Sequence, residues 1–119
     1  MDGDELEVLL SLNGASWEAG DGYVVEFTVH RTRKTPERPH GITYALVLRA
    51  IGGKAYLRFD NAHAAQRSGG RFVKAPKEHD HWHRSKDDPG RPYVFTTPMQ
   101  LLDDFWREVR RILNERRSR

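Results

Sequence analysis

Apolar and polar residues alternate along much of this 119-residue chain. Residues 23–29 alternate strictly and are rich in β-branched and aromatic side chains, which predicts a half-buried β-strand. Residues 42–51 and 54–60 form two more apolar runs of this kind, separated by Gly52-Gly53. Two glycines between such runs are typical of a tight turn, so these segments predict an antiparallel hairpin.

Other segments carry weaker signals. The alternating leucines and valine of 6–12 predict a strand, although Leu and Glu also favour a helix there. We expect short extended segments at 79–83 and 92–95, and a loop at 31–40, where two prolines interrupt regular structure. Residues 62–77 contain few apolar positions and predict a long loop insert, with its mobility left open.

The pattern changes near the end of the chain, where a helix is expected from Thr97 onward. Thr97 is a suitable N-cap, and Pro98 fits the first helical position. The apolar residues that follow recur at intervals of three and four, as Leu101, Leu102, Phe105, Val109, Ile112 and Leu113. The predicted fold is therefore α+β: one domain spanning 1–119, with an antiparallel sheet of four to five strands and one C-terminal helix packed on one face.

Composition narrows the function classes. The chain has no cysteine, which excludes disulfides, thiol nucleophiles and cysteine-based zinc sites. No apolar run approaches the ~20 residues that span a bilayer, and the N-terminus is acidic, so we expect a soluble, cytoplasmic protein without a membrane partner. The net charge is +3, and most basic residues are arginines, with six of them among the last thirteen residues. Such a surface can attract RNA, DNA or an acidic partner.

Three histidines alternate in the segment 78–83. On a strand, His79, His81 and His83 would share one face, and Trp82 would lie on the other. Two imidazoles could serve as general base and general acid in RNA cleavage. Alternatively, the segment is a polar surface strand anchored by its tryptophan.

A metal site is a third interpretation of this segment. His-x-His on a strand can chelate zinc or another transition metal, with His63 or Asp60 completing the ligands. The acid–base interpretation needs neither metal nor cofactor.

The acid–base interpretation assigns a role to each of five side chains. His81 and His83 are the acid–base pair, Asp60 is the carboxylate that orients an imidazole, and Arg58 or Arg84 is the cation that faces the phosphate.

Candidate contacts with nucleic acid lie outside this group as well. They are Arg31, Arg33 and Lys34 of the loop at 31–40, together with Tyr93, whose ring could stack on a base although burial is its more ordinary role.

A different class of function follows from the same charges. The arginine-rich C-terminal helix and the basic loop could bind nucleic acid or a partner protein without any catalysis.

Four motifs in order resemble the TumE family of small toxin–antitoxin proteins. They are Arg58-x-Asp60-Asn61, Asp80-His81-x-His83, Pro92-Tyr93-x-Phe95 and Leu101-Leu102-x-Asp104-Phe105. The chain departs from the family pattern in two ways: Phe59 stands where the family has tyrosine, and the link from 62 to 79 is much longer.

The resemblance implies a toxin with a cognate antitoxin, often a helix-turn-helix DNA-binding protein. An action on RNA follows only by analogy with other small toxins. The leading hypothesis is therefore a toxin that cleaves RNA as a metal-independent endoribonuclease. Whether it forms a homodimer stays open.

Overall fold

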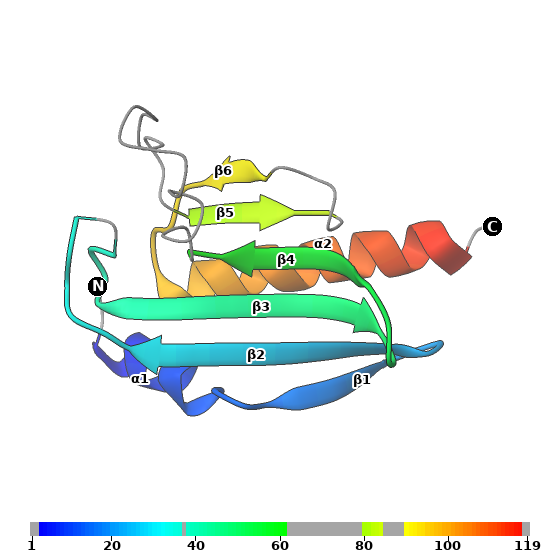
Figure 1. The fold of residues 1–119 in the computed structure, drawn as a ribbon, viewed down its shortest axis with the longest axis horizontal. Helices are drawn as coiled ribbons and strands as arrows, with labels where there is room; N and C mark the ends of the chain where they lie inside the picture. Colours follow the sequence, from blue (N-terminus) through cyan, green and yellow to red (C-terminus); the bar gives the residue numbers. More distant parts are fainter. Residues whose placement is uncertain (1–2, 37, 62–79, 85–89, 118–119) are drawn as a thin grey trace.

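The computed structural model describes residues 3–36, 38–61, 80–84 and 90–117, which form one sheet and two helices. The elements in chain order are α1 (Gly3–Ser11), β1 (Ser16–Gly20), β2 (Tyr23–Arg31), β3 (Ile42–Ala50), β4 (Ala55–Asp60), β5 (Asp80–His83), β6 (Arg91–Tyr93) and α2 (Pro98–Arg117). The strands lie in sequence order and pair antiparallel throughout. Figure 1 shows α2 running behind the sheet. The predicted α+β class is confirmed, with six strands in place of four to five.

Alternation along the strands produces the apolar face of the sheet. Val25 lies opposite Leu48, and Phe27 lies opposite Leu46 in the β2–β3 register. All four side chains are buried, so each strand pair contributes a cross-strand apolar contact to one layer. The predicted hairpin at Gly52-Gly53 joins β3 to β4, and Gly52 adopts a positive φ of 69° in the turn.

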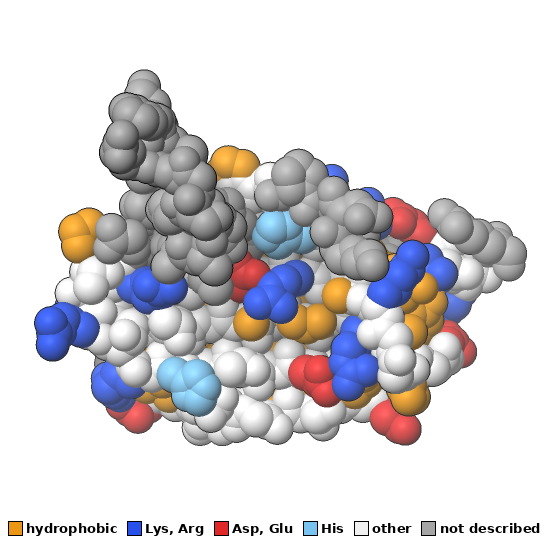
Figure 2. All heavy atoms as spheres, viewed as in Figure 1, with side chains coloured by type: hydrophobic (Ala, Val, Ile, Leu, Met, Phe, Trp, Pro, Cys, Tyr) orange, Lys and Arg blue, Asp and Glu red, His pale blue; other side chains and the backbone are white. Residues whose placement is uncertain are grey.

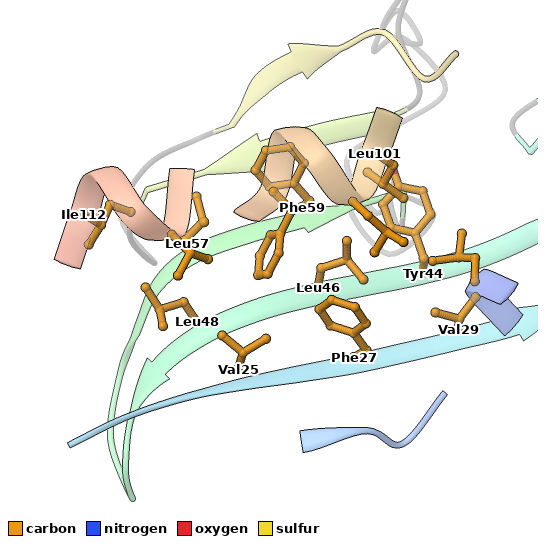
Figure 3. Packing of buried hydrophobic residues seen from close by; sticks show 14 of the residues in the cluster. Val25, Phe27, Val29, Tyr44, Leu46, Leu48, Leu57, Phe59, Leu101 and Ile112 are labelled. Atoms are coloured by element: carbon orange, nitrogen blue, oxygen red, sulfur yellow. The ribbon is translucent and has the colours of Figure 1, made fainter. Parts of the chain in front are cut away.

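The C-terminal helix closes this core. Its start is fixed by Thr97, whose hydroxyl oxygen accepts a hydrogen bond from the amide of Gln100 at 3.1 Å. All six residues of the predicted apolar stripe are buried. Figure 3 shows side chains from β2, β3 and β4, among them Phe27 and Phe59, pointing into the layer that α2 covers.

Near the N-terminus one prediction is wrong and one element was not predicted. The strand expected at 6–12 is the helix α1, because its apolar residues also fit helical spacing and Leu9 inserts fully into the core between β2 and α2. Val8, which an alternating strand would have buried with its neighbours, is 48% exposed. A short edge strand, β1, was not expected at all. It is mostly exposed and is defined by its pairing with β2.

Some predictions fall outside the described residues. These are the loop insert at 62–77 and the strand position His79. Neither helix in the described ranges is long and apolar enough to cross a membrane.

Candidate functional site

The pairing of β4 with β5 places the candidate site residues on adjacent strands. Phe59 lies opposite Trp82, and their rings are 5.7 Å apart on the face covered by α2. Arg58 lies opposite His83 in the same register. Neighbouring residues of a strand point to opposite faces of the sheet. Arg58 and His83 therefore belong to the face that neither helix covers, which is called the open face below.

The Arg58 guanidinium and the Asp60 carboxylate form an ion pair on this open face, with Nε of Arg58 donating to Oδ2 of Asp60. The Asp60 side chain is only 7% exposed, whereas that of Arg58 is 44% exposed. A buried carboxylate thus holds a cation whose remaining surface faces solvent. Figure 2 shows basic, acidic and histidine side chains close together over β4 and β5.

Glycine at position 90 allows the His83 imidazole to lie where it does. A Cβ atom placed on Gly90 would approach the ring to 2.5 Å at Cε1 and 3.0 Å at Nδ1. The φ of Gly90 is 101°, a backbone conformation that residues with a Cβ atom rarely adopt. Gly90 therefore forms one wall against which His83 is positioned. Nothing in the sequence indicated this contact.

His81 occupies the register position opposite Asp60, and opposite Pro92 on the other side of β5. The backbone of the second candidate histidine is therefore next to the buried carboxylate. Its side chain, like His63 and His79, lies outside the described part of the structure. Among the described residues, no group of three or more His, Cys, Asp or Glu could hold a metal ion.

The helix side of β5 carries a polar brace that the sequence did not reveal. The Tyr44 hydroxyl donates to Oδ2 of Asp80 at 2.5 Å, and both residues are buried. Burial raises the pKa of the Tyr44 phenol well above its ordinary value, and the nearby Asp80 carboxylate raises it further. Asp80, an element of the histidine motif, thus ties β5 to β3.

Two other motif residues make similar internal contacts. The Asn61 side chain accepts from the Tyr44 amide at 3.0 Å and donates to the Ile42 carbonyl at 2.9 Å, which extends the β3–β4 pairing beyond Asp60. The Tyr93 hydroxyl donates to Asp104 of α2 at 2.6 Å. Burial of Tyr93, together with this bond, raises its pKa. Asn61 and Tyr93 therefore brace the strands that carry the site.

The other candidate cations have partners within the fold. Arg84 donates to Glu115 of α2 at 2.7 Å, and Arg31 donates to Glu7 of α1 at 2.6 Å. Arg33 and Lys34 are exposed in the loop that joins β2 to β3. The pairing of β4 with β5 therefore brings Arg58, Asp60 and His83 together.

The arginines of α2 are largely paired as well. Arg107 lies 3.2 Å from Asp104, Arg111 lies 3.3 Å from Glu108, and Arg117 lies 2.8 Å from Asp21. These pairs reduce the charge that the C-terminal helix offers to a nucleic acid.

A sheet with one face buried under helices and with Arg58, Asp60 and His83 on the other face defines a small α+β protein. The family of this protein follows from its sequence. A family model described as Toxin TumE matches residues 11–113, and the chain belongs to that family. The resemblance seen in the motifs is confirmed, and membership implies a toxin of a toxin–antitoxin system with a cognate antitoxin as its partner. No curated protein and no solved structure matches the chain.

Proposed function

We propose that this toxin cleaves RNA, with the histidines of β5 as its acid–base groups. The observation that supports this function is the position of His83 opposite Arg58 on the face without helices. An imidazole can transfer protons, and a guanidinium on the adjacent strand can stabilise negative charge, which are the two tasks that phosphodiester cleavage requires. The family membership supports the toxin role but does not indicate which reaction the toxin catalyses.

Each group has a task in this reaction. One imidazole takes the proton of the 2′-hydroxyl, and that oxygen attacks the phosphorus. The other imidazole protonates the 5′-oxygen as its bond to phosphorus breaks. We assign these tasks to His81 and His83 as a pair and leave their order open.

Arg58 stabilises the charge that develops on the phosphate oxygens. Asp60 contacts Arg58 in the structure, so its proposed task is to hold the guanidinium in place. This differs from the imidazole-orienting task that the sequence suggested for Asp60.

The proposal is tested by alanine substitution of each histidine. His83→Ala and His81→Ala should each abolish growth inhibition when the toxin is produced without its antitoxin, and should abolish cleavage of RNA by the purified protein. His30→Ala is the matched control, because His30 is an exposed histidine two strands away on β2. It should remain fully toxic.

Circular dichroism should show that the inactive variants keep the fold. If His81→Ala or His83→Ala stays fully toxic, the acid–base assignment is wrong. If activity depends on the histidines but is eliminated by EDTA, the reaction is metal-dependent.

A further inference from the structure

Two hollows lie side by side at the C-terminal end of α2, and Arg116 lines both. One has a volume of about 260 Å³ and is also lined by Tyr56, Arg84 and Glu115. The other has a volume of about 340 Å³ and is lined by Tyr23 and Arg117, among others. Arg116 therefore divides a concave surface formed by the start of β2, the start of β4 and the last turn of α2.

The Arg116 side chain is held between two tyrosine rings. Its guanidinium carbon lies 4.2 Å from the ring centroid of Tyr56 and 5.8 Å from that of Tyr23. Its Nε donates to the hydroxyl oxygen of Tyr23. These contacts fix the plane of the guanidinium before any ligand arrives, which lowers the entropy cost of binding.

The charge of Arg116 is balanced differently from that of its neighbours. Arg84 is paired with Glu115 at 2.7 Å and Arg117 with Asp21 at 2.8 Å. The hydrogen bonds of Arg116 to described residues go to neutral phenols. Glu115 and Asp21 line the hollows too, but each is paired with a neighbouring arginine, and no ion pair joins Arg116 to a carboxylate of the described residues.

We propose that Arg116 and the two tyrosines form a subsite for one phosphate and an adjoining base of single-stranded RNA. Planar guanidinium groups bind phosphate oxygens in pairs, and aromatic rings stack on unpaired bases. An acidic peptide would need only the cation in order to bind. The two tyrosine rings add a surface on which a base can stack, which favours a nucleotide. The proposal rests on the proposed function, since the subsite would bind another part of the RNA that the toxin is proposed to cleave.

The subsite borders the candidate site along the chain. Arg84 directly follows His83, and Tyr56 precedes Arg58 by two residues. A strand of RNA that reaches the open face at β4 and β5 could therefore continue around the end of these strands to α2.

Binding of a single-stranded RNA hexanucleotide with 2′-O-methyl groups tests this subsite, because the probe lacks the hydroxyl that cleavage requires. Arg116→Gln should weaken binding about tenfold and lower the slope of log affinity against log salt by about one. Arg110→Gln is the matched control, because it removes the same charge from an exposed position of the same helix. It should change affinity less than about twofold.

A lysine variant separates binding from a purely structural role of Arg116. Arg116→Lys should restore the salt slope but only part of the affinity, because an ammonium group cannot make paired contacts with phosphate. Equal losses in the two glutamine variants, or no loss in Arg116→Gln, would overturn the subsite. So would a loss of antitoxin binding with unchanged RNA binding, which would assign the surface to a protein partner.

These outcomes are independent of the histidine test. If His83→Ala abolishes cleavage while Arg116→Gln binds the probe normally, the reaction stands and the subsite is wrong.

Discussion

The two faces of the β4–β5 strand pair contain different kinds of residues. On the helix side, Phe59 packs against Trp82 and against Phe105 of α2, with ring centroids 5.7 and 5.6 Å apart. On the open side, the next positions carry Arg58 opposite His83. Stability and proposed chemistry are thus assigned to alternate residues of the same two strands.

Polar groups follow the same division. Asp80 faces the helix side, where the Tyr44 hydroxyl donates to it within the core. Asp60 lies on the open side, where a solvent-exposed arginine balances it. The comparison shows two buried carboxylates with different partners: Asp80 is held by a hydroxyl inside the core, and Asp60 holds a cation that is partly exposed to solvent.

The largest expected effect is on the helix side. Phe59→Ala should lower the free energy of unfolding by about 3–5 kcal/mol, because it removes a buried ring that touches three other aromatic residues. Denaturant titration measures this loss. His83→Ala, one strand away on the open side, should lower it by less than about 1 kcal/mol. Equal losses in the two variants would contradict the division between the faces.

A substitution at Gly90 should instead affect activity, through the position of His83. Gly90→Ala places a methyl group within 2.5 Å of the His83 ring, so the imidazole must move. We expect RNA cleavage to fall at least about tenfold, since small displacements of a catalytic group are costly.

Gly22→Ala is the control for backbone strain. Gly22 has a positive φ of 86°, and a Cβ atom there meets nothing within 4 Å. This variant should lose about 1 kcal/mol of stability and keep its activity. If both alanine variants lose activity equally, Gly90 does not act by positioning His83.

Local patterns predicted most of the fold because they reflect strong local physics. Period-two alternation identified β2, β3 and β4, and the cap at Thr97 with its apolar stripe identified α2. The segment 6–12 failed because its apolar residues fit both periods, and only burial of Leu9 against distant elements decides for the helix. The edge strand β1 has no buried residue, and its pairing with β2 is what defines it.

The candidate site divides in the same way. Arg58, Asp60 and His83 could be selected from residue chemistry, and their motifs identified the family. The contacts of Tyr44 with Asp80 and of Gly90 with His83 join residues that no spacing rule connects. Such contacts depend on the pairing of β5 with its neighbours, which local sequence does not encode.

The brace on the helix side predicts a response to alkaline pH. Tyr44→Phe should lower the free energy of unfolding by about 1–2 kcal/mol at neutral pH, because it removes a buried hydrogen bond to Asp80. The pKa of Tyr44 is raised above 10.0 in the folded chain, so its contribution is complete below pH 10 and is lost as pH rises further. Denaturant titrations from pH 8 to pH 11 should show a shallower alkaline decline in the variant.

Tyr93 shares this behaviour, since its pKa is also raised. A residual alkaline decline in Tyr44→Phe is therefore expected, and it should diminish when Tyr93 is replaced by Phe as well. An unchanged decline in the double variant would show that these phenols do not set the alkaline limit.

The smallest expected effect concerns the start of α2, which supports the helix side without touching the open face. Thr97→Ala should lower the free energy of unfolding by about 1 kcal/mol, because the amide of Gln100 loses its side-chain acceptor. Thr97→Ser keeps a hydroxyl at the cap and should lose much less. RNA cleavage at a temperature well below unfolding should be the same in both variants, because the hydrogen bond of the cap joins Thr97 to Gln100 within the first turn of α2. If Thr97→Ala lowered activity at such a temperature, helix position and site geometry would be coupled, and the two faces would not be independent.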